Sequence, residues 1–193
     1  MKIGILGAGN VGSALGNAWA RQQHEIMFGS REPGAEKGAT RSGTIEEAAK
    51  FGDVVALALP WQAARDLLPS LKLAGKTVID CTNPLGHALA SSGAEALHAL
   101  APGAKFVKAF NTTGANNMAN PTYAGGPLAM LYCGDHADAK KTAAELIRQI
   151  GFEPYDLGPL ANARLLEAQA ELWIWLASRG GLGREFGFHL VRR

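Results

Sequence analysis

The sequence has few of the residues on which metal centres and nucleophilic catalysis depend. Only two of its 193 residues are cysteines, Cys81 and Cys133, and their spacing excludes a C-x-x-C metal or redox site. We expect both to be partly buried thiols rather than a disulfide. The five histidines are scattered, with no pair at metal-ligand spacing and no evident serine or cysteine partner. Because a Gly-x-Ser-x-Gly motif is also missing, the sequence argues against a hydrolase, and we predict no metal site.

The sequence also lacks long apolar runs and an excess of charge of one sign. No segment reaches the length that spans a membrane, and the formal net charge is +2. Basic residues form no run longer than a pair, such as the terminal Arg192-Arg193, so neither nucleic acid nor a membrane is an expected partner. The first residues, MKIGIL, run directly into an apolar segment, so we expect no signal peptide and a cytoplasmic protein.

What the sequence does contain is a glycine-rich turn between a strand and a helix, within residues 2–16. The apolar run Ile3–Leu6 is too short for a helix and predicts a buried parallel strand. Gly7, Gly9 and Gly12 follow as a G-x-G-x-x-G motif, after which the apolar pattern becomes helical. In this context Gly7 permits a tight turn, Gly9 lets the backbone approach a pyrophosphate, and Gly12 allows close helix–strand packing. The motif therefore predicts a dinucleotide site at the N-terminus of the first helix.

Strand-like and helical segments alternate along the rest of the chain. Further strands are expected at residues 25–28, 53–59, 76–80, 105–109, 128–133 and 152–156, and further helices at 44–51, 62–68, 94–100, 135–150 and 162–179. Thr44 and Glu47 predict a capping box at the start of the helix 44–51. We expect a loop at 32–43 and only a short helix within 114–128. This alternation predicts an α/β protein with a doubly wound, mostly parallel sheet, the Rossmann arrangement, and a short helical C-terminal extension. We assign residues 1–158 to the dinucleotide-binding domain, and residues 159–193 to a helix and tail that pack on the cleft or on a dimer mate.

The ligand site is expected where the strands end, near the point at which the strand order reverses. Five segments occupy such positions: Gly7–Gly12, Gly29–Arg31, Leu59-Pro60-Trp61, Cys81–Asn83 and Phe110–Gly114. The segment Leu59-Pro60-Trp61 would place apolar surface beside a nicotinamide. Alternatively, Trp61 simply belongs to the core. These segments carry no evident acid–base pair, and hydride transfer requires none, since it needs two reacting rings held together. We therefore predict binding residues and no catalytic residue.

The end of the second strand distinguishes NADP from NAD. Where an NAD-binding protein carries an acidic residue for the ribose 2′-hydroxyl, this sequence has Gly29-Ser30-Arg31. A hydroxyl and a guanidinium suit a 2′-phosphate, because the arginine fork pairs with phosphate oxygens. Glu32 follows one residue later and complicates this interpretation, since an acidic side chain repels a phosphate. Simple solvation of Arg31 is the alternative.

Several segments together resemble the coenzyme F420-dependent NADP oxidoreductases and the related oxidoreductase domain of the STEAP metalloreductases. The resemblance rests on GILGAGNVGSAL, HEIMFGSR, ALALPWQAA, VIDCTNPLG, VKAFNT, CGDHADAKK and YDLGPLANARLLE, and it covers nearly the whole chain. It implies an NADP-binding Rossmann domain with a small C-terminal extension, often homodimeric. The residues that it places along the cofactor are Ala8, Gly9, Asn10, Val11, Ser30, Arg31, Leu59, Ala63 and Ala115, while Phe186 matches a position that touches the deazaflavin in the F420 enzymes.

One position separates the two branches of this resemblance. The F420 enzymes carry a histidine where this sequence has Asn111, and KAFNT is closer to the STEAP-like version, whose partner is FAD. We expect an NADP(H)-dependent oxidoreductase that passes a hydride between the nicotinamide and F420 or a flavin. We predict that Phe186 and Trp61 line an apolar slot for this planar acceptor, with Asn111 at its edge. Alternatively, Phe186 packs against the body of the protein.

Two other functions stay open. The first is an imine or hydroxyacid reductase of the pyrroline-5-carboxylate reductase type, which shares the glycine fingerprint. That class needs a larger helical substrate domain than the C-terminal residues provide, and also a proton donor. The second is a non-catalytic module that binds or senses a dinucleotide.

Overall fold

Short apolar segments form the strands of a central sheet in the computed structural model, which describes residues 1–32, 41–191 and 193. Over these residues the sheet has eight strands in the order β10-β9-β6-β5-β4-β1-β2-β3. Their bounds are β1 (Lys2–Leu6), β2 (Glu25–Gly29), β3 (Ser42–Gly43), β4 (Val54–Leu57), β5 (Thr77–Asp80), β6 (Lys105–Lys108), β9 (Ala129–Gly134) and β10 (Glu153–Asp156). A separate hairpin joins β7 (Thr122–Tyr123) to β8 (Gly126–Pro127).

The register of the sheet brings the carboxyl ends of its strands into one row. Neighbouring strands pair in parallel except β6 and β9, which are antiparallel. Leu6 pairs with Gly29 on one side and with Leu57 on the other, and the row continues through Asp80 to Lys108. The strand order reverses at β1, between β2 and β4. The predicted doubly wound, mostly parallel sheet is therefore confirmed.

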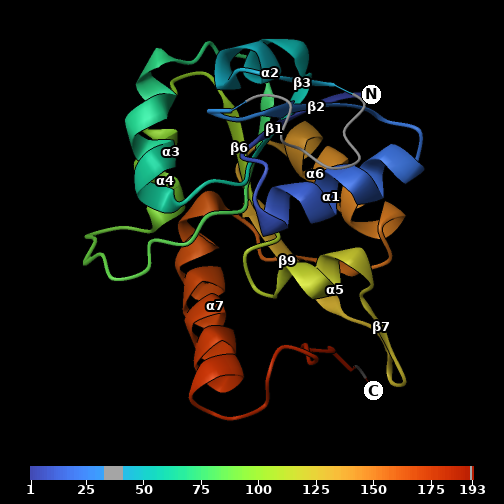
Figure 1. The fold of residues 1–193 in the computed structure, drawn as a ribbon. Helices are drawn as coiled ribbons and strands as arrows, with labels where there is room; N and C mark the ends of the chain where they lie inside the picture. Colours follow the sequence, from blue (N-terminus) through green and yellow to red (C-terminus); the bar gives the residue numbers. More distant parts are fainter. Residues whose placement is uncertain (33–40, 192) are drawn as a thin grey trace.

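Helices cover both faces of this sheet (Figure 1). They are α1 (Asn10–Arg21), α2 (Ile45–Phe51), α3 (Trp61–Leu67), α4 (Gly93–His98), α5 (Ala115–Ala119), α6 (Ala137–Gln149) and α7 (Ala163–Ser178), with short 3₁₀ turns at Leu68–Ser70 and Leu160–Asn162. Side chains alternate between the faces, as the pleat requires. Ile3 and Ile5 join a core cluster with α1 and α6, whereas Leu6 joins the cluster under α2, α3, α4 and α7.

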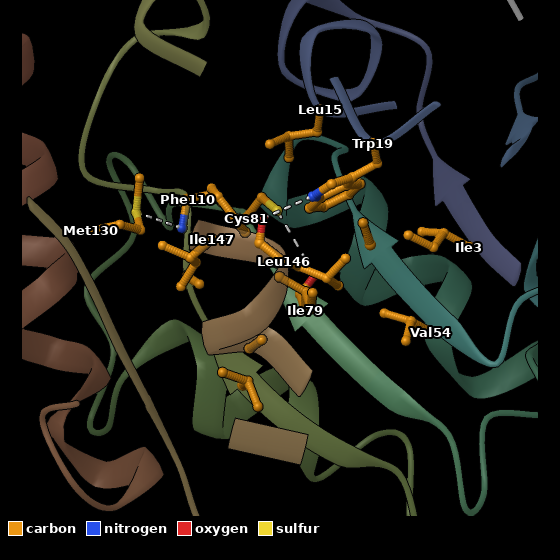
Figure 2. Close-up of a cluster of buried hydrophobic side chains, with 14 of the residues drawn as sticks. Ile3, Leu15, Trp19, Val54, Ile79, Cys81, Phe110, Met130, Leu146 and Ile147 are labelled. Atoms are coloured by element: carbon orange, nitrogen blue, oxygen red, sulfur yellow. Dashed lines mark hydrogen bonds between the residues drawn. The ribbon is translucent and has the colours of Figure 1, made fainter. Parts of the chain in front are cut away.

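The first of these clusters is organised around Trp19 of α1 (Figure 2). The Trp19 indole N–H donates to the carbonyl of Leu146 in α6 at 3.1 Å, which satisfies the polar atom of a fully buried side chain. The Phe110 ring stands edge-on to this indole with 5.6 Å between centroids. Residues 127 positions apart in sequence are thus joined beneath the sheet.

Helix starts follow the local sequence. The predicted capping box at α2 is confirmed: the Thr44 hydroxyl accepts from the N–H of Glu47 at 3.2 Å, and the Glu47 carboxylate accepts from the N–H of Thr44 at 2.8 Å. A second capping box, formed by Ser92 and Glu95, begins α4. It has the same S/T-x-x-E spacing, so the sequence carried its signal.

The fold differs from the expectations in three short segments. Of the loop expected at 32–43, residues 33–40 lie outside the described residues, and its end forms the two-residue strand β3 beside β2. Such a strand is too short to show periodicity. The strand expected at 53–59 ends at Leu57, and residues 114–128 hold both α5 and the β7–β8 hairpin.

The C-terminal segment packs along its own chain. The side chains of Ala163 and Leu166 in α7 belong to the second core cluster. The tail then returns along α5 and β9, where the carbonyl of Phe188 accepts from the N–H of Ala129 at 2.8 Å (Figure 1). Among the described helices, none combines the length and apolarity needed to cross a membrane.

Candidate functional site

The glycine turn after β1 borders open space at one position and packs closely at two others. The N–H of Gly7, whose φ is 106°, donates to the carbonyl of Gly29 at 2.9 Å and so joins the ends of β1 and β2. A Cβ on Gly7 would collide with the carbonyl of Ala58, and one on Gly12 with the carbonyl of Gly7. A Cβ on Gly9 would meet nothing within 4 Å. The backbone at Gly9 is therefore open to a ligand.

This open space belongs to a cavity of about 780 Å³, a size typical of small-molecule sites. Of the residues predicted from the sequence, it is lined by Gly7, Ala8, Gly9, Ser30, Arg31, Leu59, Pro60 and Ala63. Glu32, Ile45, Ala58, Asp66 and Leu67 line it as well. Ile45 of α2 and Asp66 and Leu67 of α3 were not predicted, because only the folded chain brings these helices over the strand ends.

The other fingerprint residues, Asn10, Val11 and Gly12, form the first turn of α1 and are not among the cavity-lining residues. Backbone N–H groups in the first turn of a helix have no intrahelical acceptor. The turn that leads to them is held by the hydroxyl of Ser13, which donates to the carbonyl of Ala8 at 2.9 Å. The free N–H groups and the positive end of the helix dipole suit an anion beside the turn.

Ser30 and Arg31 form the end of the cavity beyond β2. The N–H of Ser30 donates to the carbonyl of Gly43 at 3.1 Å, so β3 fixes the position at which β2 ends. The side chains of Arg31 and Glu32 are exposed and both line the cavity. A guanidinium beside a hydroxyl is a donor set for phosphate oxygens, while the adjacent carboxylate opposes an anion there.

Two asparagine side chains are paired at the ends of β5 and β6. The Asn83 amide donates to the carbonyl of Asn111 at 3.0 Å, and the Asn111 amide donates to Oδ1 of Asn83 at 3.0 Å and to the carbonyl of Leu166 at 3.1 Å. Oδ1 of Asn111 is buried and accepts no hydrogen bond from the described residues. Neither asparagine is among the residues that line the cavity.

The backbone just before Asn111 is strained. Phe110 has φ 61°, a left-handed conformation that is an outlier for a bulky side chain. Its fully buried ring and the hydrogen bond from its N–H to Sδ of Met130, at 3.2 Å, hold it there (Figure 2). Such strain concentrates at functional positions, and here it turns the chain so that Asn111 reaches Asn83.

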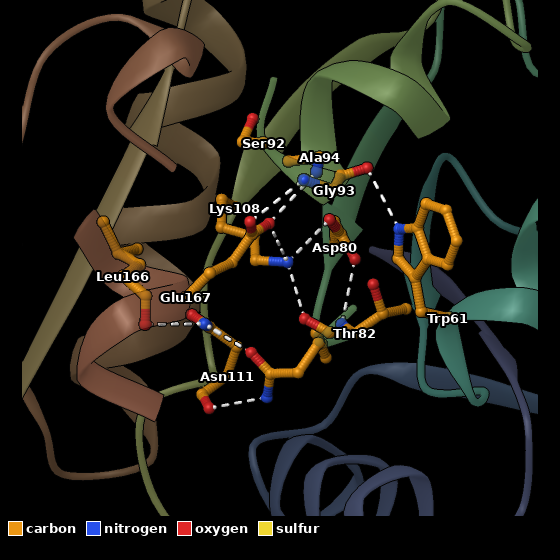
Figure 3. A network of polar contacts seen from close by, with 12 residues as sticks. Trp61, Asp80, Thr82, Ser92, Gly93, Ala94, Lys108, Asn111, Leu166 and Glu167 are labelled. Atoms are coloured by element: carbon orange, nitrogen blue, oxygen red, sulfur yellow. Dashed lines mark hydrogen bonds and ion pairs between the residues drawn. The ribbon is translucent and has the colours of Figure 1, made fainter. Parts of the chain in front are cut away.

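A buried ionic network behind these asparagines was not predicted (Figure 3). Nζ of Lys108, at the end of β6, lies 2.9 Å from Oδ2 of Asp80 and 3.2 Å from Oε1 of Glu167, and it donates to the carbonyl of Thr82 at 2.6 Å. The side chains of Lys108 and Asp80 are fully buried. The signal in the sequence was a lysine within the apolar run KFVKAF, facing an aspartate that ends the neighbouring strand.

The same network attaches α7 to the body of the molecule. The Glu167 carboxylate accepts from the N–H of Gly93 at 2.9 Å and of Ala94 at 3.1 Å, at the start of α4. Oδ1 of Asp80 accepts from the N–H of Thr82 at 2.9 Å. Every charge in the cluster therefore has a partner, and together they fix the turn that carries Asn83.

The position of Trp61 differs from its predicted place in the acceptor slot. Its side chain is only 3% exposed, and its indole N–H donates to the carbonyl of Gly93 at 3.1 Å (Figure 3). Its neighbours Pro60 and Ala63 line the cavity, but Trp61 does not. The turn of α3 directs this indole into the core against α4, so the core alternative describes Trp61.

Phe186 lies beside the loop that follows β6. Its ring is stacked on Trp173 of α7 with 5.3 Å between centroids, and a Cβ added to Gly114 would touch the Trp173 ring. The carbonyl of Phe186 accepts from Trp173 Nε1 and from the Asn117 amide of α5. Ala115 begins α5 directly after Gly114. The tail thus brings Phe186 close to the predicted segment 110–114. Trp61, the other predicted side of the slot, does not join it there.

The chemistry of the described residues includes neither an activated thiol nor a metal cluster. Burial raises the pKa of the Cys81 thiol far above its usual range, and the charge of Asp80 adds to this effect. Burial also raises the pKa of Cys133 to about 12. Both thiols are therefore held in their protonated, unreactive form. No group of three or more metal-ligating side chains occurs within residues 1–32, 41–191 and 193.

Comparison with known proteins identifies the relatives of this chain. Residues 2–84 match the family described as NADP oxidoreductase, coenzyme F420-dependent. The F420-dependent NADP reductase of Methanocaldococcus jannaschii is 31% identical over 91% of this chain and 92% of its own length. Metalloreductase STEAP3 of Rattus norvegicus is 36% identical over 86% of this chain, which spans only 36% of that longer protein.

A solved structure agrees over the whole length. The crystal structure assigned as an F420-dependent NADP-reductase from Arthrobacter sp. FB24 superimposes with a TM-score of 0.88, at 28% identity and with 100% of each chain covered. The match with the archaeal reductase covers nearly all of both chains. This chain therefore belongs to the family of F420-dependent NADP reductases and is an NADP-dependent oxidoreductase.

Proposed function

We propose that the chain binds NADP(H) in the cavity beyond β1, β2 and β4 and passes a hydride between its nicotinamide and a planar acceptor, either F420 or a flavin. The observation that carries this proposal is the open backbone at Gly9, between the first turn of α1 and the cationic end at Arg31. A pyrophosphate and a 2′-phosphate are the anions that these two ends of one cavity suit.

Each part of the cavity has a role in this proposal. The N–H groups of Asn10, Val11 and Gly12 hold the pyrophosphate, Ser30 and Arg31 bind the 2′-phosphate, and Leu59, Pro60 and Ala63 cover the cofactor. The bound cofactor supplies the hydride chemistry. The protein orients the two rings and excludes water, which requires no acid–base side chain.

We place the nicotinamide end toward the asparagine pair. Asn83 and Asn111 follow β5 and β6, and the Oδ1 of Asn111 is buried there without a hydrogen-bond partner among the described residues. Phe186 and Trp173 offer stacked aromatic surface beside Gly114 and Ala115, and we propose that they border the acceptor. The relatives named as F420-dependent reductases favour F420, whereas the asparagine at position 111 favours a flavin.

We also propose a cytoplasmic homodimer in which α7 and the tail contribute to the interface. Leu165, Leu172 and Trp175 are about half exposed on α7. Leu165 and Leu172 are seven residues apart and so share one face of the helix. In this proposal residues 1–158 form the dinucleotide-binding unit and residues 159–193 cover both its cleft and the partner. Sedimentation velocity that finds a monomer would contradict it.

Calorimetric titration with NADPH and NADH tests the proposed cofactor. We expect NADPH to bind more tightly by a factor of about ten or more, because charge-assisted hydrogen bonds to a phosphate contribute about 1.5–3 kcal/mol. Equal affinity for the two dinucleotides would contradict the assignment of Ser30 and Arg31.

A further inference from the structure

We propose that Asp66 reads the base of the dinucleotide, with its carboxylate accepting a hydrogen bond from the exocyclic amino group of adenine. This inference rests on the proposed binding of NADP(H) in the cavity. Asp66 of α3 would determine specificity for the base, whereas the glycine motif and Arg31 contact only the phosphates.

The lining of the cavity identifies which half of the dinucleotide it receives. It contains the glycine turn and the Ser30–Arg31 corner, but not Asn83, Asn111 or Ala115. With the pyrophosphate at the turn and the 2′-phosphate at Arg31, the cavity holds the adenosine half. The adenine must therefore lie against the lining that the phosphates leave free.

That remaining lining has the chemistry of a purine site. Ile45 of α2, together with Ala63 and Leu67 of α3, supplies apolar surface for the faces of the ring. Asp66 is the polar residue that α3 contributes to the cavity. Planar bases are commonly held in this way, by apolar contacts on their faces and by a few polar groups at their edge.

The exposed carboxylate of Asp66 accepts one hydrogen bond within α3 and retains a free oxygen. Gln62, one helical turn earlier, donates from Nε2 to Oδ1 of Asp66 at 2.8 Å. Among the described residues, no hydrogen bond is made to Oδ2. A carboxylate only accepts hydrogen bonds, so it matches the amino group at position 6 of adenine and opposes the carbonyl oxygen that hypoxanthine carries there.

The charge of Asp66 determines how this inference must be tested. A carboxylate in a cavity that also receives a phosphate repels that phosphate, so removing it alters the affinity for every dinucleotide. The informative quantity is therefore the ratio of affinities for NADPH and for the same dinucleotide with hypoxanthine in place of adenine. Glu32→Gln supplies a matched control, because it removes a carboxylate from the same cavity at its phosphate end.

Titration of the wild type, Asp66→Asn and Glu32→Gln with both dinucleotides completes the test. We expect the wild type and Glu32→Gln to prefer NADPH by about tenfold or more, as a site built around a substrate hydrogen bond does. In Asp66→Asn the amide can turn its NH₂ toward the hypoxanthine carbonyl, so we expect the ratio to fall within about threefold of unity.

The outcomes separate this inference from the function on which it rests. A wild type that binds both dinucleotides equally, or an Asp66→Asn variant that keeps the wild-type ratio while NADPH still binds, overturns the role of Asp66 alone. If the ratio of the two affinities falls as far in Glu32→Gln as in Asp66→Asn, the role of Asp66 is also overturned. The loss of a negative charge from the cavity would then explain the change in both variants. A wild type that binds neither dinucleotide overturns the proposed function and this inference with it.

Discussion

Gly9 and Gly12 belong to one motif but differ in what an added methyl group would meet. The space beside Gly9 is open, whereas a Cβ on Gly12 would overlap the carbonyl of Gly7. The same substitution should therefore affect binding at one position and folding at the other. This distinction depends on where the helix enters the turn, and the motif alone does not reveal it.

At Gly9 we predict a loss of binding without a loss of fold. Gly9→Val should weaken NADPH binding by more than about tenfold, since its side chain would occupy the place of the pyrophosphate. Its circular dichroism spectrum and urea midpoint should stay near the wild-type values. Gly12→Ala is the contrasting variant and should lose about 1–3 kcal/mol of stability through overpacking. Retained NADPH affinity in folded Gly9→Val would remove the glycine turn from the site.

The prediction on the choice between NADPH and NADH concerns Arg31. Arg31→Ala should cost about 1.5–3 kcal/mol of NADPH binding, the range for hydrogen bonds to charged groups, and little of NADH binding. Calorimetry with both dinucleotides measures this difference. Arg65→Ala is a suitable control, because this arginine lies over the Trp61 ring and does not line the cavity. A similar loss for NADH would indicate that Arg31 acts on the charge of the cavity as a whole.

At the scale of elements, Lys108 joins β5, β6, α4 and α7 through buried charges. Removing the lysine would leave the carboxylates of Asp80 and Glu167 without their cation in a dry environment. We predict that Lys108→Met destabilises the protein by about 3–5 kcal/mol, as breakage of a buried pair does. Urea unfolding followed by circular dichroism measures the change.

The same substitution elsewhere on β6 serves as the control. Lys105 forms a surface ion pair with Asp138, whose exposed carboxyl has a pKa lowered chiefly by its hydrogen bond from Lys105. Surface pairs contribute little, so Lys105→Met should leave the unfolding midpoint close to that of the wild type. Equal midpoints for the two variants would show that the buried network does not stabilise the fold.

The tail is the second element with a distinct prediction. Deleting residues 183–193 should leave NADPH affinity within about threefold, which is less than 1 kcal/mol, yet abolish hydride transfer to the acceptor. Phe186→Ala separates the ring from the packing of the tail, because the hydrogen bonds from Asn117 and Trp173 end on the backbone carbonyl. A folded Phe186→Ala protein that reduces its acceptor at the wild-type rate would place the acceptor elsewhere.

For the whole molecule, the features predicted from the sequence are those that local patterns determine. Apolar runs and helical periodicity were sufficient for the longer strands and helices, though not for β3 or the β7–β8 hairpin, and the glycine spacing was sufficient for the turn. Ser30 and Arg31, which line the cavity, could be singled out because the end of the second strand has a fixed relation to that turn. The fold class follows from the alternation of these elements alone.

The features that were missed depend on which residues meet across the sheet. Asp80 and Lys108 are adjacent only through the register of β5 and β6, and Glu167 joins them from a helix 59 positions beyond Lys108 in the sequence. Asp66 enters the cavity only because α3 lies over the strand ends. The sequence left two environments open for Trp61, the acceptor slot and the core. Its hydrogen bond to the carbonyl of Gly93, which lies in α4, places it in the core, and the local sequence does not reveal this contact.

The most direct test of hydride transfer is stopped-flow measurement of the reduced-nicotinamide absorbance after NADPH-loaded protein is mixed with F420, FAD, FMN or pyrroline carboxylate in turn. We expect rapid loss of this absorbance with F420 or a flavin, slower loss when NADH replaces NADPH, and no loss with pyrroline carboxylate. Tight NADPH binding with no oxidation by any acceptor would contradict the proposed hydride transfer and favour a dinucleotide sensor, and oxidation by pyrroline carboxylate alone would favour an imine reductase.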